Sequence, residues 1–165
     1  MILKTMEKKR ILFVCLGNIC RSPATEGIMY KFIQAENLDN EFEVDSAGTM
    51  GYHTGERADP RMRRIAKDRG YDLTSRARKF NPDEDFDHFD FIVTMDNQNY
   101  SDIKRLDISN RFNYKILKMA DFCKINKIKE VPDPYYSGDE GFEYVIDILE
   151  EGCSNLLTQI KNKNK

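Results

Sequence analysis

The segment from Cys15 to Ser22 carries the residues of this sequence that are best suited to chemistry. It reads Cys-Leu-Gly-Asn-Ile-Cys-Arg-Ser, so a thiol and a guanidinium lie on one short stretch of chain. A thiol in positive surroundings ionises to a nucleophile, and an arginine can hold two oxygens of a phosphate. A thiolate that faces a bound phosphate can attack phosphorus and expel an alcohol. The spacing therefore predicts phosphoryl transfer, with Cys15 as nucleophile and Arg21 as phosphate clamp.

The flanking sequence places this segment between a buried strand and a helix. Residues 10–15 form a continuous apolar run, which is typical of a strand that is covered on both faces of a parallel sheet. Ser22 and Pro23 then predict a helix start, with the serine as cap and the proline at the first position. Backbone N–H groups at a helix N-terminus bind anions, and Gly17 lets the backbone turn closely. We expect this loop to cradle a phosphate, with the Ser22 hydroxyl supporting the Cys15 sulfur.

The remaining predicted elements alternate between strand and helix along the chain. Apolar runs predict further strands, and apolar residues at helical spacing predict the helices. The strands are expected at 42–46, 90–95 and 114–117, and the helices at 23–33, 59–70, 97–106 and 142–160. This order predicts an α/β fold with a parallel sheet and helices on both faces. Ligands of such sheets bind at the carboxyl ends of the strands, where the loop after the first strand lies.

Composition limits the classes of protein to which the chain can belong. With 165 residues, the chain is expected to form one domain over 1–165, frayed at 1–9 and 161–165. A net charge of −2 argues against a nucleic-acid partner, and no apolar run is long enough to insert into a membrane. The N-terminus does not resemble a signal peptide, so we expect a cytoplasmic protein with reduced thiols.

Several sequence features have simpler interpretations than catalysis. Cys15 and Cys20 could form half of a zinc site, but no second pair of ligands stands at the required spacing, so no metal or other cofactor is expected. The loop also lacks the Gly-Lys-Ser/Thr ending of a nucleotide-binding loop. Cys123 and Cys153 are expected to be core thiols. The basic cluster of Arg76, Arg78 and Lys79 is expected to form a solvated face.

The stretch from Val14 to Pro23 resembles the signature of the low-molecular-weight protein tyrosine phosphatases. Three further motifs match in order, namely Asp45-Ser-Ala-Gly48, Met95-Asp96 and Asp133-Pro-Tyr-Tyr136. The resemblance extends from Arg10 to about Leu157. It implies a three-layer fold with a four-stranded parallel sheet and a phosphate-binding loop after the first strand. It also implies a metal-independent phosphoric monoester hydrolase that acts on phosphotyrosine proteins or small aryl phosphates through a phosphocysteine.

The resemblance further implies roles for individual residues. Asp133 is implied to protonate the leaving phenolate and then to accept a proton from water. Ser46 and Asp96 are implied to support the site from behind, and Asn18 to shape the loop by hydrogen bonds. Activity that needs ionised Cys15 and protonated Asp133 would follow a bell-shaped pH profile weighted towards acid. The residues implied to contact the substrate, or inhibitory phosphate and other oxyanions, are Leu16, Gly17, Asn18, Ile19, Cys20, Ser22, Tyr52 and Tyr135.

The sequence departs from the family pattern behind the loop and at the pocket wall. Arg69 precedes Gly70, where many members carry histidine beside the loop network, and Tyr52 occupies a wall position that is often tryptophan. The resemblance also implies that Cys20 can protect the enzyme by forming a disulfide with Cys15 after the latter is oxidised to a sulfenic acid. Intact-mass analysis after mild peroxide would test this pairing.

Three alternative functions stay open at this stage. A thiol-dependent arsenate reductase would need further cysteines in the middle of the chain, and none lies between Cys20 and Cys123. A protein arginine phosphatase tends to carry threonine at the position of Ile19. A non-catalytic phosphotyrosine-binding module would be expected to lack Cys15 or Asp133, and both are present. These features favour the tyrosine phosphatase.

Overall fold

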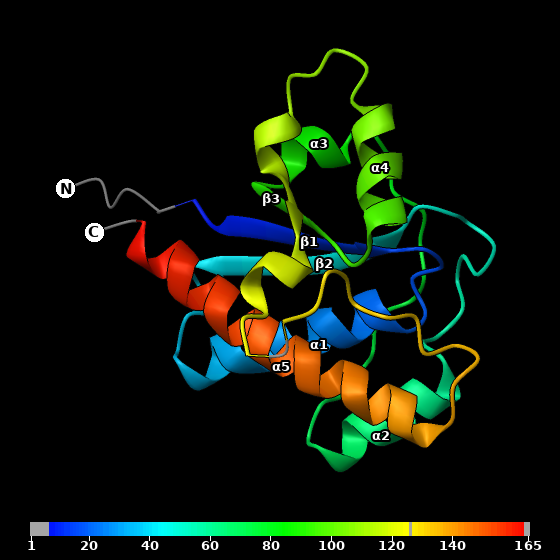
Figure 1. The fold of residues 1–165 in the computed structure, drawn as a ribbon. Coiled ribbons are helices and arrows are strands. Elements are labelled where there is room, and N and C mark those ends of the chain that lie inside the picture. Colours follow the sequence, from blue (N-terminus) through cyan, green and yellow to red (C-terminus); the bar gives the residue numbers. More distant parts are fainter. Residues whose placement is uncertain (1–6, 126, 164–165) are drawn as a thin grey trace.

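The four strands of the chain form a single parallel sheet. The computed structural model describes residues 7–125 and 127–163. The strands are β1 (Lys9–Cys15), β2 (Phe42–Gly48), β3 (Phe91–Thr94) and β4 (Ile116–Lys118), and their spatial order is β2-β1-β3-β4. This arrangement confirms the predicted α/β class with four parallel strands (Figure 1). β1 is central, so the loop that follows it lies in the middle of the carboxyl edge of the sheet.

Helices cover both faces of this sheet, which gives the predicted three layers. In Figure 1, α1 (Arg21–Ala35), α2 (Pro60–Asp68) and α5 (Asp139–Asn162) lie on one side, and α3 (Asp85–His88) and α4 (Asn97–Leu106) lie on the other. Two short 3-10 turns, Asn113–Lys115 and Met119–Phe122, flank β4.

Alternate residues of β1 enter different hydrophobic cores. Ile11 and Phe13 pack with α1 and α5, whereas Leu12 and Val14 pack with residues around α3 and α4. All four side chains are fully buried. Because successive side chains of a strand point to opposite faces, a strand covered on both sides must be apolar at every position. This explains the continuous apolar run that precedes Cys15.

The long helix α5 supplies much of the larger core. Its buried side chains recur at offsets of three and four residues from Phe142 to Ile160, as predicted. Cys153 is among them, and Cys123 packs against the same helix, so the prediction of core thiols is confirmed. Burial, together with the charge of Glu151, raises the pKa of the Cys123 thiol to about 12.

The structure corrects several predicted boundaries. Lys9 belongs to β1, and Lys161 and Asn162 belong to α5, so these residues of the predicted frayed ends are ordered in secondary structure. The Lys161 ammonium also lies 2.9 Å from a Glu36 carboxylate oxygen, which attaches the end of α5 to α1. Residues 1–6 and 164–165 lie outside the described residues.

The start of α1 also differs from the prediction. The helix begins at Arg21, its N-cap position is Cys20, and no side chain caps it. Ser22 is therefore inside the first turn and does not act as the cap. Its hydroxyl is turned towards the preceding loop, where it takes part in the contacts described below.

Candidate active site

A pocket of about 270 Å³ opens at the carboxyl end of β1. Its floor is formed by the loop between β1 and α1, and its walls come from two distant loops. Cys15, Arg21 and Asp133 all line it, so the structure brings together the three residues predicted to be catalytic. The other lining residues are Leu16, Gly17, Ile19, Cys20, His53, Tyr135 and Tyr136.

The Cys15 sulfur is held by a hydroxyl from the first turn of α1. Cys15 is the last residue of β1 and is 3% exposed, and its Sγ lies 3.0 Å from the Ser22 Oγ. The Asn18 amide donates to the same Oγ at 2.8 Å. The hydroxyl proton then has two acceptors within reach, the Cys15 sulfur at 3.0 Å and the Ala47 carbonyl oxygen at 3.4 Å, and the sulfur is the nearer. This geometry suits a serine that stabilises a thiolate.

Asn18 holds the phosphate loop from behind. Its backbone has a φ of 57°, a left-handed conformation that asparagine tolerates better than most residues. Its side chain is 2% exposed and donates to Ser46 Oγ at 2.9 Å as well as to Ser22. Asn18 and Ser22 thus do not line the pocket, although they were predicted among its substrate contacts. They shape the loop from inside the protein.

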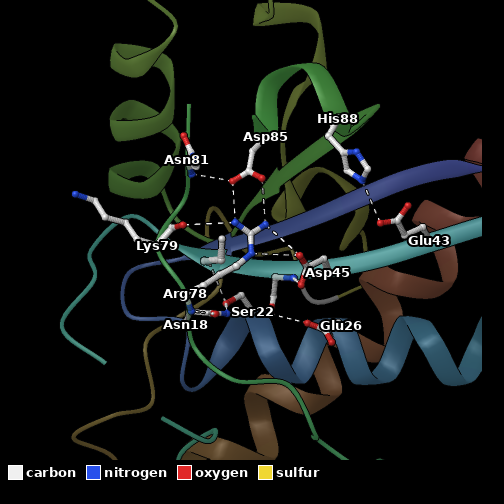
Figure 2. Close-up of polar contacts among 12 residues, drawn as sticks. Asn18, Ser22, Glu26, Glu43, Asp45, Arg78, Lys79, Asn81, Asp85 and His88 are labelled. Carbon is white, nitrogen blue, oxygen red and sulfur yellow. Dashed lines mark hydrogen bonds and ion pairs between the residues drawn. The ribbon is translucent and has the colours of Figure 1, made fainter. Parts of the chain in front are cut away.

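Arg78 anchors Asn18 from the side of β2. The Arg78 backbone N–H donates to Asn18 Oδ1 at 3.0 Å, and the Arg78 carbonyl accepts from the Gly48 N–H at 2.8 Å. The guanidinium lies between Asp45 of β2 and Asp85 of α3, with its closest contact to Asp85 at 2.9 Å (Figure 2). Arg78 is therefore a structural tie to the loop, which corrects the prediction that it belongs to a solvated face.

The Arg21 guanidinium, which is predicted to clamp the phosphate, is oriented by a helix cap. Arg21 is 2% exposed, and its Nη1 donates to Asp96 Oδ2 at 2.7 Å and to the Val131 carbonyl at 3.0 Å. The other oxygen of Asp96 caps α4 by accepting from the Asn99 N–H at 2.7 Å. Burial would lower the pKa of Arg21, but the charges of Cys15 and Asp96 hold it above its ordinary value. The guanidinium therefore stays charged and fixed in orientation.

Asp133 faces the same guanidinium from a loop. Its Oδ2 lies 3.7 Å from Arg21 Nη2, and its side chain is 45% exposed. Its Oδ1 accepts from the Tyr135 N–H at 3.1 Å, which fixes the carboxylate relative to the following residues. A group placed between the loop and Asp133 would meet the thiol on one side and this carboxyl on the other.

One wall of the pocket differs from the predicted one. Tyr52 is 79% exposed and is not among the residues that line the pocket, whereas the adjacent His53 is. The His53 Nδ1 lies 2.8 Å from Glu56, in a turn closed by the Glu56 N–H and the His53 carbonyl. This turn directs the imidazole over Gly17, where an added Cβ would lie 3.1 Å from the ring.

Cys20 is a pocket residue with a protonated thiol. It is 5% exposed, and burial followed by the negative charges of Asp59 and Cys15 raises its pKa well above the usual range. All four cysteines are free thiols. Of the two cysteines in the loop, only Cys15 has a hydroxyl contact that supports the anion.

Arg69 does not take part in the loop network. Its guanidinium forms ion pairs with three carboxylates of α5, those of Glu143, Asp147 and Glu150. Burial alone would lower its pKa, but these contacts raise it far above the ordinary value. In this chain the residue before Gly70 therefore fastens α2 to α5, and its chemistry is separate from the pocket.

Gly48 is required by the close approach of the phosphate loop, a role that the sequence analysis did not identify. A Cβ at this position would lie 2.7 Å from the Leu16 carbonyl oxygen and 3.1 Å from the Asn18 nitrogen. Both are backbone atoms of the loop, so they cannot move away without displacing it.

We therefore expect Gly48→Ala to disturb catalysis more than stability. The loop must shift, which should reduce kcat/KM by roughly 10²-fold and destabilise the fold by about 1–3 kcal/mol. Steady-state kinetics and urea unfolding measure the two effects. Gly138→Ala is the matched control, because an added Cβ there meets nothing within 4 Å. Unchanged kinetics in Gly48→Ala would contradict the close approach.

Glu26 closes the network behind Asn18 and is also missing from the sequence prediction. It accepts from Ser46 Oγ at 2.6 Å. Burial raises its pKa from 4.5 to about 7, against the opposing effect of the Ser46 hydrogen bond. An acid whose pKa is raised by folding stabilises the fold when it is protonated. That contribution is complete below about pH 4.5 and is lost as the pH rises through about 7.

Glu26→Gln should therefore stabilise the protein more at pH 8 than at pH 5. The amide keeps an acceptor for Ser46 and cannot ionise, so the expected gain at pH 8 is about 1–3 kcal/mol. Urea unfolding at the two pH values measures it. Glu41→Gln, at an exposed position, controls for the change in net charge. An equal effect at both pH values would show that ionisation of Glu26 is not the cause.

The described residues contain neither a metal-binding cluster nor a membrane-spanning helix. Over residues 7–125 and 127–163, no group of three or more histidine, cysteine, aspartate or glutamate side chains is arranged to hold a metal ion. Within the same residues, no helix combines the length and the apolar character that crossing a membrane requires.

The chain matches known proteins over almost its whole length. Residues 10–165 match the family model of the low molecular weight phosphotyrosine protein phosphatases. The Synechocystis protein slr0328, assigned to the low molecular weight protein-tyrosine-phosphatases, is 48% identical over 151 residues, which cover 92% of this chain and 96% of the relative.

Solved structures agree with this match. The crystal structure of a protein tyrosine phosphatase from Entamoeba histolytica, with Hepes in its active site, is similar with a TM-score of 0.92 and 47% identity, and the match covers 96% of this chain and 100% of that one. The structure of a Drosophila arginine phosphatase is also similar, with a TM-score of 0.85 and 29% identity over 92% of this chain and 97% of that one.

Proposed function

Because this chain belongs to the low molecular weight phosphotyrosine protein phosphatases, we propose that it hydrolyses phosphotyrosine through a phosphocysteine on Cys15. The chain is a phosphoric monoester hydrolase, as its relatives are. The observation that carries the proposal is the position of the buried Cys15 sulfur, 3.0 Å from Ser22 Oγ, in a pocket that Arg21 and Asp133 also line. Phosphotyrosine proteins and small aryl phosphates are the proposed substrates.

In the first step, the Cys15 thiolate attacks phosphorus and the bond to the tyrosine oxygen breaks. Arg21 and the backbone N–H groups before α1 hold the phosphate oxygens, and the first N–H groups of a helix have no partner within the helix. Asp133 in its acid form gives its proton to the departing phenolate oxygen. The products of this step are tyrosine and an S-phosphorylated Cys15.

In the second step, water attacks the phosphorus of the phosphocysteine. The Asp133 carboxylate, left unprotonated by the first step, takes a proton from that water as the new bond to phosphorus forms. The bond between sulfur and phosphorus breaks, and inorganic phosphate is released. The Ser22 hydroxyl stabilises the returning thiolate, which lowers the barrier for sulfur to leave. The cycle uses no metal or other cofactor.

An aryl ester suits the pocket better than a phosphoramidate does. Leu16 and Tyr135 supply apolar and aromatic surface at its mouth, and the branched side chain of Ile19 lines it. The similarity to a Drosophila arginine phosphatase keeps phosphoarginine as the second candidate substrate. Ile19 offers no hydroxyl to orient a phosphoramidate nitrogen. Hepes, a molecule with a sulfonate group, is present in the active site of the Entamoeba relative, and this supports the proposal that tetrahedral oxyanions inhibit the present chain.

The test compares two substrates that differ only in the phosphorylated residue. Release of inorganic phosphate is followed from a phosphotyrosine peptide and from the matching phosphoarginine peptide, under reducing conditions and with excess EDTA. We expect turnover of the phosphotyrosine peptide at a rate that EDTA does not change. Faster turnover of phosphoarginine would reverse the assignment. A requirement for reduced thiol is consistent with a reducing compartment such as the cytoplasm.

A further inference from the structure

The outer face of α2 carries positive charges, most of which have no carboxylate partner among the residues that the structure describes. The inner face of the helix, with Met62, Ile65 and Ala66, is buried, and this fixes the orientation of the helix. The opposite face and the loop before it surround a hollow of about 330 Å³. We call its cationic wall the α2 basic surface, which consists of Arg57, Arg63, Arg64 and Lys67.

Most of these cations have no carboxylate partner within the described residues. Over 7–125 and 127–163, Arg57, Arg63 and Lys67 form no ion pair, and Arg64 pairs only with the exposed Asp139. Asp72 also lines the hollow, but it forms no ion pair with them in that part of the chain. Arg69, near the end of the same helix, is instead held by three carboxylates.

Repulsion among these cations slightly lowers the stability of α2 when no anion is bound. Arg63 and Lys67 are separated by one helical turn, and like charges at this spacing destabilise a helix. An anionic partner would remove this repulsion. The surface also belongs to a chain whose net charge is −2, so the positive charge is local. A cationic hollow of this kind favours an acidic segment of a partner protein.

The helix that carries the α2 basic surface also contacts the rim of the active-site pocket. The Asp59 N–H, at the start of α2, donates to the carbonyl of Ile19 in the phosphate loop at 2.8 Å. Arg61 of the same helix lies over the ring of Tyr135, with its Cζ 5.3 Å from the ring centroid. Arg57 follows closely after His53, which lines the pocket. A chain that places a side chain in the pocket therefore has its neighbouring residues within reach of α2.

We propose that the α2 basic surface binds acidic residues that flank the phosphotyrosine of a protein substrate. This inference rests on the proposed function, because it assigns the surface to the same substrate. Rim charges act mainly on association, so the effect should appear in KM more than in kcat and should weaken with salt. A small aryl phosphate does not extend beyond the pocket and should be insensitive to the surface.

The experiment compares a pair of peptides on the native chain and on a variant in which two cations of the α2 basic surface are replaced by glutamine. Two phosphotyrosine peptides, with glutamates or glutamines around the phosphotyrosine, are compared with p-nitrophenyl phosphate. The variant is Arg57→Gln with Lys67→Gln, and both are exposed positions that line the hollow. The control is Lys104→Gln with Arg105→Gln on α4, which removes the same charge from the other side of the sheet (Figure 1). Glutamine preserves helix propensity at the three helical positions, Lys67, Lys104 and Arg105.

We expect the α2 variant to lose activity on the acidic peptide and to keep its activity on the other substrates. The native chain should favour the glutamate peptide in kcat/KM by roughly three- to tenfold at low salt, from two to three screened ion pairs. The α2 variant should bring this ratio close to one, and the α4 control should leave it unchanged. All three proteins should hydrolyse p-nitrophenyl phosphate alike. A native ratio near one, or a ratio that the α2 variant retains, would overturn the proposal. Failure of the native chain to hydrolyse any phosphotyrosine peptide would instead overturn the proposed function.

Discussion

Cys15→Ser is expected to reduce phosphate release from a phosphotyrosine peptide by on the order of 10⁴- to 10⁶-fold, the scale seen when a nucleophile is removed. A serine hydroxyl at this position fits the space next to Ser22, whose Oγ lies 3.0 Å from the sulfur. It ionises far less readily than a thiol, so it cannot form the phosphoryl intermediate at a useful rate. Steady-state release of inorganic phosphate measures the loss.

Binding should survive this substitution. Arg21 keeps its contacts with Asp96 and Val131, and Asn18 still shapes the loop, so phosphate contacts are preserved. The Cys15→Ser variant does not hydrolyse the phosphotyrosine peptide, so isothermal titration calorimetry can measure its binding. We expect a dissociation constant close to the KM of the native chain. Cys20→Ser is the informative comparison, because its thiol is held protonated. If Cys20→Ser lost activity as completely as Cys15→Ser, the assignment of the nucleophile would be wrong.

Asp133→Asn is expected to slow the hydrolysis of phosphotyrosine by roughly 10²- to 10⁴-fold, the range for loss of a general acid. The amide retains an oxygen for the Tyr135 N–H, so the loop should keep its shape. It cannot donate a proton as the carboxylic acid does. The loss should therefore depend on the leaving group, being large for tyrosine and much smaller for an activated phenol such as p-nitrophenol.

This dependence separates proton transfer from simple positioning. An equal loss with every leaving group would mean that Asp133 orients Arg21, which lies 3.7 Å away, and does not supply the proton. Single-turnover experiments with a good leaving group should also show accumulation of phosphorylated Cys15, because the variant lacks the base for the second step. Asp102→Asn on α4 is the matched control, and its kinetics should be native.

The sequence was most informative where the pattern is local. The apolar run of β1, the loop after it and the amphipathic spacing of α5 each depend on neighbours in the chain, and each was predicted with nearly the observed bounds. Cys15 and Arg21 were identified in the same way, because a strand, a short loop and a helix fix their relative positions. The role of Asp133 was predicted only from the resemblance to the family, because no local sequence pattern indicates that its loop lies at the pocket.

The prediction that Ser22 caps α1 failed because one hydroxyl had competing partners. Ser-Pro is a strong start signal for a helix, yet the Ser22 Oγ contacts Cys15 and Asn18 instead of a backbone N–H of the helix. The N-terminal N–H groups of α1 are left without a side-chain cap. In a phosphate-binding loop this is favourable, because a capping oxygen would occupy the donors that the ligand needs.

Other features could not be predicted because their partners are distant in sequence. Arg78 binds Asp45 and Asp85, and Arg69 binds a row of acids on α5. The spacing of the acidic residues in α5 predicts that they share one face of the helix, but the sequence does not indicate which cation pairs with them. The choice between Tyr52 and His53 at the pocket wall depends on a turn in an irregular loop, where no periodicity indicates the direction of a side chain.

The double use of Asp96 limits how far the phosphate loop can be treated as an independent module. Asparagine, serine and threonine also cap helices, but only a carboxylate offers one oxygen to the Asn99 N–H and a second, charged oxygen to Arg21. A loop grafted onto another α/β scaffold would carry Cys15 and Arg21 with it, but not this anchor. A designer would have to import the first turn of α4 and the end of β3 as well, so the anchor of Arg21 alone already spans two adjacent strands of the sheet.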